Sequence, residues 1–136
     1  MHGVTWWPAY SVTGNYKGVL DSLANNQMSR PALIPAYTWL DSKKPQGVHD
    51  LDIKKVNGKK CLVWRAHETD DPMQQAVRYV VYRFPKGKKA SIDNAAAILA
   101  ITGETSFVLP DCGKGKWQYA VTALDRCWNE SDPSWK

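Results

Sequence analysis

Carboxylate side chains are the first candidates for chemistry in this sequence, because acid–base hydrolysis generally uses two of them, facing each other about 5 to 10 Å apart. Residues 1–40 contain a single acid, Asp21, in the middle of a predicted helix. The densest acidic cluster is 67–71, His-Glu-Thr-Asp-Asp, and such carboxylates are ligands for hard cations. The cluster lacks the glycine-spaced pattern of a calcium loop, and no second cluster has matching spacing. We therefore predict no catalytic pair and no metal site, and interpret 67–71 as a solvated loop.

Three aromatic residues near the start of the chain, Trp6, Trp7 and Tyr10, are the best candidates for ligand binding. Aromatic planes stack on the apolar faces of sugar rings while the sugar hydroxyls stay hydrogen-bonded. The alternative is that the three side chains pack inside a domain or at a domain junction. His2 and His49 stand alone in the sequence and are interpreted as surface or packing residues.

The cysteines give no sign of a metal or disulfide framework. Cys61, Cys112 and Cys127 are odd in number and have no CxxC spacing, so neither a zinc site nor a disulfide scaffold is predicted. A Cys112–Cys127 pair is conceivable across neighbouring loops, and free thiols are the favoured interpretation. We predict no cofactor.

Composition indicates a folded domain with a short appendage. The chain has 136 residues, 43% of them hydrophobic, with 7 Trp and 6 Tyr, which is enough for one self-sufficient core. No apolar run approaches the roughly 20 residues of a membrane span. The net charge is +5, yet the lysines occur mostly as pairs beside turn signals, at 43–44, 54–55, 59–60 and 88–89. A nucleic-acid surface would concentrate cations on one face between stacking aromatics, so no nucleic-acid partner is predicted.

Residues 1–42 form an appendage with its own character. A strand over Val4–Trp7 is followed by Pro8 and by a turn-rich stretch, 11–15. Asn15 can cap a helix of about ten residues. The apolar face of that helix has three- and four-residue spacing and comprises Tyr16, Val19, Leu20, Leu23 and Ala24.

A helix this short is marginal in water by itself, so its apolar face must be covered. We expect the face to pack on the following domain or on a second copy of the chain, as a homo-oligomer. Residues 30–41, interrupted by Pro31 and Pro35, are predicted to be an extended strap lying across a surface. Strand, helix and strap together suit the last βα unit of an α/β barrel and its exit segment.

Residues 43–136 show the short alternating runs of an all-β sandwich. Asn57-Gly58 is a strong hairpin dipeptide between the first two strands. The expected inward-facing pairs are Leu62 with Trp64 and Tyr79 with Val81. Further strands are expected at 98–101, 105–109, 117–123 and from about 129. The fold class is therefore mainly β, an immunoglobulin-like seven-stranded β-sandwich with an N-terminal strand-helix-extended appendage.

These strands resemble the fibronectin type III family. The similarity lies in Leu62-Val63-Trp64, in Tyr79-Val80-Val81-Tyr82-Arg83, in the 117–125 run Trp-Gln-Tyr-Ala-Val-Thr-Ala-Leu-Asp, and in Asn129-Glu130-Ser131. One position departs from the family, which usually has a tyrosine where Trp117 stands. The hydroxyl of that tyrosine holds the preceding loop, so we expect the corner to be fixed differently or to be looser here.

The first third resembles the end of the barrel in a bacterial glycoside-hydrolase-like family, in which a fibronectin-like domain directly follows the barrel. The similarity rests on three stretches: Gly3-Val4-Thr5-Trp6-Trp7, Lys17-Gly18-Val19-Leu20, and Arg30-Pro31-Ala32-Leu33-Ile34-Pro35 with Trp39-Leu40-Asp41. It implies a secreted, periplasmic or cell-surface protein that handles glycans. Trp6, Trp7 and Tyr10 would then point to the active-site face, whereas Tyr37 and Trp39 would fasten the strap to the sandwich.

We expect this chain to act as a non-catalytic accessory module that packs against the catalytic barrel of its parent, and any enzyme activity to belong to that parent. One barrel unit cannot build a catalytic cleft, since a whole barrel needs about 250 residues. Two alternatives remain: a carbohydrate-binding module with an aromatic platform, and an adhesion or protein-interaction domain. Glycan binding by this chain supports the first alternative, and glycan-independent capture of a partner supports the second.

Overall fold

The computed structural model describes residues 9–26, 28–110 and 116–136. The chain divides into two compact units, with the boundary between Pro31 and Ala32. The first unit contains α1 (Ala9–Thr13), the 3₁₀ turn η1 (Tyr16–Gly18) and α2 (Val19–Asn25). All of the strap from Ala32 onward therefore belongs to the second unit, whereas the predicted boundary lies between residues 42 and 43. Among the described residues, no helix is long and apolar enough to cross a membrane.

The turn predicted at 11–15 is wrong for its first half, because α1 extends to Thr13. The Thr13 hydroxyl donates to the carbonyl of Ala9 at 3.3 Å, which satisfies its polar group inside the helix. The chain then turns at Gly14, whose N–H donates to the Tyr10 carbonyl at 2.8 Å. The predicted strand Val4–Trp7 lies outside the described residues.

The predicted helix at 16–25 is shorter than expected, since α2 begins at Val19. Lys17 and Gly18 have φ values of 51° and 73°, and this left-handed backbone breaks the helix between η1 and α2. Asn15 does cap α2, as predicted, but from further upstream: its Oδ1 accepts from the N–H of Leu20 at 2.9 Å and of Asp21 at 3.2 Å. The helix ends at Asn25, as expected.

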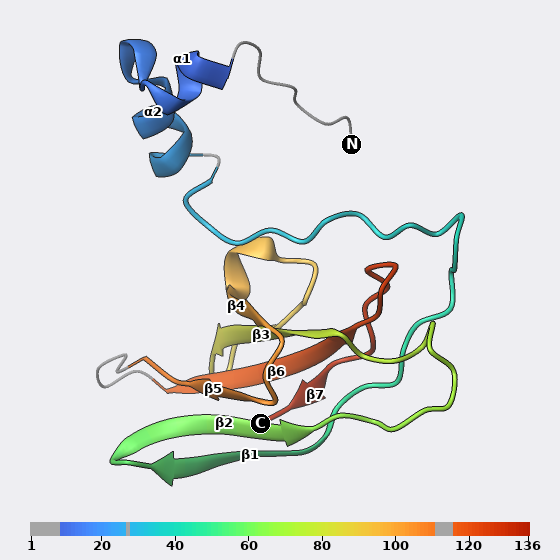
Figure 1. The fold of residues 1–136 in the computed structure, drawn as a ribbon. Coiled ribbons are helices and arrows are strands. Elements are labelled where there is room, and N and C mark those ends of the chain that lie inside the picture. The colour runs from blue at the N-terminus through green and yellow to red at the C-terminus, as the bar shows by residue number, and fades with distance from the viewer. Residues whose placement is uncertain (1–8, 27, 111–115) are drawn as a thin grey trace. The chain divides into compact units, whose positions relative to one another are not determined.

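The second unit is a β-sandwich, as the sequence predicts (Figure 1). A three-stranded antiparallel sheet has the order β1-β2-β5, and a four-stranded antiparallel sheet has the order β4-β3-β6-β7. The strands are β1 (His49–Val56), β2 (Lys59–Arg65), β3 (Arg78–Pro85), β4 (Ile98–Thr102), β5 (Ser106–Val108), β6 (Trp117–Leu124) and β7 (Ser134–Trp135). A short 3₁₀ turn, η2 (Ala95–Ala97), precedes β4.

The strand boundaries follow local turn chemistry. Asn57 and Gly58 have φ values of 51° and 77°, which is the backbone of a tight hairpin turn, and they join β1 to β2 as predicted. The last strand starts later than the predicted residue 129. Leu124 and Glu130 form an isolated bridge, and β7 begins only after Pro133, which has no N–H to donate to a ladder.

The core between the sheets is the one that the alternating pattern predicts. Trp64 is buried and contacts Tyr79 edge to face, with ring centroids 5.5 Å apart. Its cluster of buried residues comprises Val48, Leu62, Trp64, Tyr79, Val81, Leu109, Tyr119, Val121 and Ala123. The indole N–H of Trp64 is buried and has no hydrogen-bond partner among the described residues, so the ring is held by apolar packing.

A second apolar cluster covers the outer face of the four-stranded sheet, which the sequence analysis did not predict. Val80, Tyr82 and Phe84 of β3 point to this face and are fully or almost fully buried. They are covered by Leu33 from the strap and by the segment that precedes β4. Figure 1 shows the strap crossing above this sheet, which confirms the predicted extended strap.

The hydroxyl of Tyr82 is hydrogen-bonded to Glu130 at this second cluster. Its hydroxyl donates to Oε1 of Glu130 at 2.6 Å, and the Thr122 hydroxyl donates to the same oxygen at 2.6 Å. Burial, reinforced by the hydrogen bond and the charge of Glu130, raises the pKa of Tyr82 far above its usual value near 10. The folded protein therefore keeps this phenol protonated in alkaline solution.

We predict that Tyr82→Phe reduces the alkaline sensitivity of the fold. Below pH 10 the phenol is protonated in both states, whereas above pH 10 it ionises only in the unfolded chain, so stability falls as pH rises. Between pH 9 and pH 11 one such tyrosine accounts for about 1.4 kcal/mol. Urea unfolding at both pH values should show a loss smaller by about that amount in Tyr82→Phe. Equal losses in the two proteins would contradict the assignment.

The described residues of the corner before β6, Lys116 and Trp117, are held by a cation–π contact and a backbone hydrogen bond. The indole N–H of Trp117 has no hydrogen-bond partner among the described residues, and the Arg83 guanidinium lies over its ring at 4.6 Å. The backbone also joins this position to the end of β3, because Lys86 N–H donates to the Lys116 carbonyl at 2.9 Å. A cation–π contact and a main-chain bond thus hold the position.

Candidate docking site

The strap ends in an exposed apolar turn. Tyr37 N–H donates to the carbonyl of Cys127 at 2.8 Å, and Leu40 N–H donates to the Tyr37 carbonyl at 2.9 Å. Trp39 is 75% exposed and Leu40 is 66% exposed, while the Tyr37 and Trp39 rings meet edge to face at 5.1 Å. Tyr37 therefore fastens the strap as expected. The same prediction is wrong for Trp39, whose ring faces solvent.

Asp41 and Asn129 lock this turn onto the sandwich. The Asp41 carboxylate accepts from Nε2 of Gln74 at 2.7 Å, and its carbonyl accepts from Nδ2 of Asn129 at 3.0 Å. The same Asn129 amide donates to Oδ2 of Asp125 at 2.9 Å. The exposed turn is therefore held at a defined place by hydrogen bonds to two separate loops.

Asp125 is the buried centre of this arrangement, with 1% of its surface exposed. Its Oδ1 accepts from the N–H groups of Cys127 at 2.7 Å and of Asn129 at 2.9 Å. These bonds shape the 125–129 turn, to which the strap is attached. Asp125 and Asn129 belong to the fibronectin-like sequence pattern, which by itself gives them no role. The sequence feature that could have identified them is a carboxylate directly after a buried strand, with an amide four residues later.

The cysteine in this turn is unsuited to nucleophilic chemistry. Burial, together with the charges of Asp125 and Asp41, raises the pKa of the Cys127 thiol, so the reactive thiolate is disfavoured. Cys127 and Cys61 are both buried free thiols, in agreement with the favoured prediction. Cys112 lies outside the described residues.

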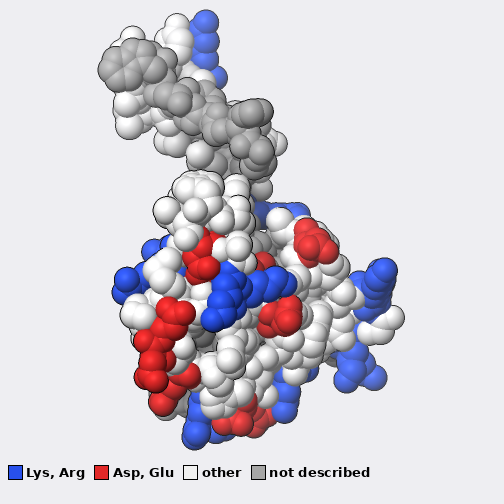
Figure 2. All heavy atoms as spheres, turned by 90° about the vertical axis from the view of Figure 1, so that its right-hand side faces the viewer, with Lys and Arg blue, Asp and Glu red and all other residues white. Residues whose placement is uncertain are grey.

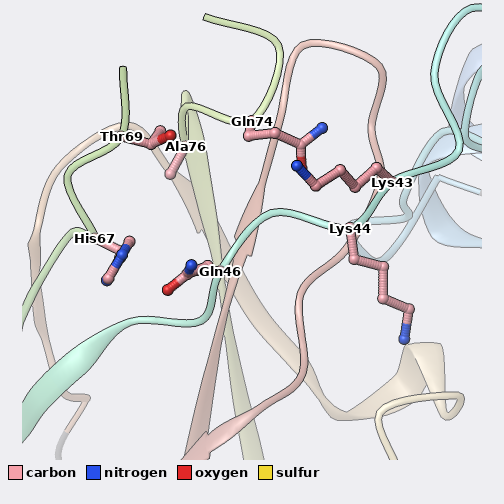
Figure 3. A pocket seen from close by; sticks show the side chains of 7 residues that line it. All are labelled: Lys43, Lys44, Gln46, His67, Thr69, Gln74 and Ala76. Atoms are coloured by element: carbon pink, nitrogen blue, oxygen red, sulfur yellow. The ribbon is translucent and has the colours of Figure 1, made fainter. Parts of the chain in front are cut away.

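A small cavity lies next to the locked turn (Figure 3). Its volume is ≈ 70 Å³, and it is lined by Lys43, Lys44, Gln46, His67, Thr69, Gln74 and Ala76. Figure 3 shows Lys43 extending toward the Gln74 amide and Lys44 pointing away. Oε1 of Gln74 is buried without a hydrogen-bond partner among the described residues. The cavity has room for about two water molecules, and is too small for a sugar ring.

Polar groups of the acidic loop 67–71 form hydrogen bonds within the loop and to the residue Met73 just after it. Oδ1 of Asp71 accepts from the N–H of Met73 at 3.0 Å, and the Thr69 hydroxyl accepts from the N–H of Asp71 at 3.2 Å. Within 9–26, 28–110 and 116–136, no group of three His, Cys, Asp or Glu side chains is placed to hold a metal ion. Figure 2 looks onto this end of the sandwich and shows acidic side chains spread around a basic patch.

His49, which the sequence analysis treated as ordinary, connects two segments. Its Nδ1 lies 3.2 Å from Oδ2 of Asp50, and its Nε2 lies 3.1 Å from the Ala66 carbonyl. The ring therefore bridges the start of β1 and the loop after β2. His2 lies outside the described residues.

The predicted ligand-binding aromatics remain a prediction. Trp6 and Trp7 lie outside the described residues. Tyr10 is in α1 of the first unit, and 74% of its surface is exposed.

Comparisons with known proteins point to glycosidase-related proteins. No family model matches the chain. The chain is 30% identical over 122 residues to Glycosyl hydrolase YngK of Bacillus subtilis (strain 168), a match that covers 88% of this chain and 23% of that relative. The fold resembles part of the Endo-D glycoside hydrolase domain from Streptococcus pneumoniae R6, with a TM-score of 0.50 and 15% identity over 71% of this chain and 15% of that one. The second likeness concerns the fold alone. The chain is thus homologous to about a quarter of a glycosyl hydrolase-like protein, and 71% of it is related in fold to part of a glycoside hydrolase structure.

Proposed function

We propose that this chain is a non-catalytic accessory module, with a fibronectin type III-like sandwich, at the C-terminal end of a longer, exported glycoside-hydrolase-like protein. The similarity to 23% of YngK supports a place within a larger protein. The seven strands in two antiparallel sheets support the fibronectin-like assignment. In this setting the module packs against the catalytic barrel, stabilises it and fixes its orientation.

The observation that carries the proposal is the exposed turn at Trp39 and Leu40. Two large apolar side chains lie in solvent on a segment that is hydrogen-bonded to the sandwich through Tyr37 and Asp41. A preorganised apolar projection loses little conformational entropy on docking. Tryptophan is also among the residues that contribute most to protein interfaces. The strap directly follows the first unit in the chain, and in this proposal its turn meets a barrel surface of the same polypeptide.

The test is the double variant Trp39→Ala/Leu40→Ala in the longer protein encoded by the source gene. We expect the barrel transition in differential scanning calorimetry to fall by about 4 °C or more, since a central interface tryptophan contributes about 2 kcal/mol or more. In the 136-residue chain alone the same change should alter stability by less than about 0.5 kcal/mol, as for other exposed sites. Val56→Ala, an exposed apolar residue on β1, is the matched control.

Two results would reject the proposal. The first is a gene that encodes no barrel before these residues, and the second is a barrel transition that the double variant leaves unchanged. Binding of the chain to neutral glycans, lost in Trp39→Ala, would instead favour a carbohydrate-binding module, for which the exposed Trp39 ring offers a stacking face.

A further inference from the structure

Lysines that are scattered along the sequence gather at one end of the sandwich. Lys55, Lys59 and Lys60 flank the β1–β2 turn. Lys86 follows β3 and is bonded through its N–H to the carbonyl of Lys116, which precedes β6. Figure 1 shows the β1–β2 turn and the end of β3 at the same end of the sandwich. We call this region the basic end; its lysines are Lys55, Lys59, Lys60, Lys86, Lys88, Lys89 and Lys116.

The described residues offer the lysines of the basic end no ion-pair partner; the acid next to Pro110 in the sequence, Asp111, lies outside the described residues. All seven lysines are exposed, and none forms an ion pair with another described residue. The segments 54–60 and 84–90 contain no Asp or Glu. Several exposed acids instead lie toward the opposite end, among them Asp50, Glu68, Asp70, Asp71, Glu104 and Asp132. At that opposite end Lys44 and Arg65 pair with Asp132 and Asp50. The lysines of the basic end have no described partner, so they create a positive field there, and a polyanion that neutralises them relieves their mutual repulsion.

The basic end contains a hollow that could hold part of a ligand. It has a volume of ≈ 350 Å³ and is lined by Lys55, Gly58, Lys59, Lys60, Val108, Leu109 and Pro110. Val108 is 52% exposed, so the lining combines ammonium groups with an apolar surface. Leu109 N–H donates to the Lys60 carbonyl at 2.8 Å, which fixes the end of β5 against β2. The volume lies in the range of small-ligand sites, and it is about five times that of the cavity near Gln74.

We propose that the basic end binds an acidic polysaccharide whose sugars carry carboxylate groups. One sugar ring lies in the hollow, with an apolar ring face against Val108 and Pro110 and its carboxylate near Lys59 and Lys60. Carboxylates of neighbouring sugars meet the lysines at 86–89 and 116. The site uses none of the residues of the strap turn, so it does not depend on docking to a barrel.

The chemistry of the lining favours this ligand over a nucleic acid. The charged residues that line the hollow, Lys55, Lys59 and Lys60, are all lysines, whereas bidentate recognition of phosphate favours the planar fork of arginine. Among the residues that the structure describes, no aromatic side chain lines the hollow, and base stacking is a main source of affinity for single strands.

The experiment measures binding of polygalacturonate oligomers to the 136-residue chain by isothermal titration calorimetry. We expect binding that weakens as NaCl rises from 50 to 200 mM, because exposed charges are screened. Lys59→Glu/Lys60→Glu should weaken it at least tenfold. The matched control Lys43→Glu/Lys44→Glu, with the same change of net charge at the opposite end of the sandwich, should change it less than twofold. Circular dichroism and thermal unfolding establish that both variants are folded.

Three results would overturn the proposal: no detectable binding at 50 mM NaCl, equal weakening by the two double variants, or equal binding of methyl-esterified polygalacturonate. Tighter binding of a DNA oligomer than of polygalacturonate would also overturn it and assign the basic end to nucleic acid. None of these outcomes bears on Trp39 and Leu40, so the docking proposal is tested separately.

Discussion

Trp64→Ala should destabilise the sandwich by about 3–5 kcal/mol, the usual cost of removing a large buried aromatic side chain. Trp64 is 4% exposed and lies in the cluster that joins the two sheets. Its ring packs on Tyr79, so alanine would leave a cavity where both sheets meet. Chemical unfolding in guanidinium, followed by circular dichroism, measures the loss. A marginal domain would be largely unfolded by a change of this size.

The companion variant Trp64→Phe separates packing from polarity. Because the indole N–H has no partner among the described residues, phenylalanine gives up no hydrogen bond and keeps most of the buried area. We expect a loss of less than about half that of Trp64→Ala. Trp39→Ala, at an exposed position, serves as the control and should change stability by less than about 0.5 kcal/mol. A loss below about 1 kcal/mol in Trp64→Ala would show that the ring is not enclosed between the sheets.

Asp125→Ala should have the second largest effect, a loss of about 3 kcal/mol or more in the free energy of unfolding. The substitution leaves the Cys127 N–H, the Asn129 N–H and the Asn129 amide without their acceptor. Unpaired buried donors cost about 1–3 kcal/mol each. Urea unfolding of the 136-residue chain measures the change.

Asp125→Asn and Asp132→Ala are the controls for this prediction. Asparagine keeps one carbonyl acceptor for the two N–H groups, so its loss should be smaller than that of alanine. Asp132 pairs with Lys44 at 3.2 Å on the surface, where an ion pair is worth about 0–1 kcal/mol. If Asp132→Ala destabilises as much as Asp125→Ala, the buried acceptor has no special part in holding the turn.

The inner core could be predicted from the sequence because alternation identifies one face of each strand. Leu62 and Trp64, like Tyr79 and Val81, are two residues apart and are all buried. Alternation by itself does not identify the outer cluster, because both faces of β3 are buried. The run from Tyr79 to Tyr82 has no polar residue, which is the pattern of a strand buried on both faces, and that signal was present.

The locked turn and the basic end could not be predicted in the same way. The Gln74–Asp41 bond joins residues 33 positions apart, and the Asn129–Asp41 bond joins residues 88 apart, so neither has a local signature. The lysine pairs beside turns were visible in the sequence and suggested dispersed charge. The antiparallel order of the strands brings several of those turns to one end, and pattern alone does not reveal that order.

The covering of the outer sheet face by Leu33 has a practical consequence for dissecting the protein. A fragment cut at the predicted boundary of residue 43 would lack the strap and expose part of the apolar surface at Val80, Tyr82 and Phe84. Uncovered apolar sheet surface promotes self-association. The sandwich is therefore best produced as an independent piece that begins at about Ala32, eleven residues before the start that sequence patterning indicates.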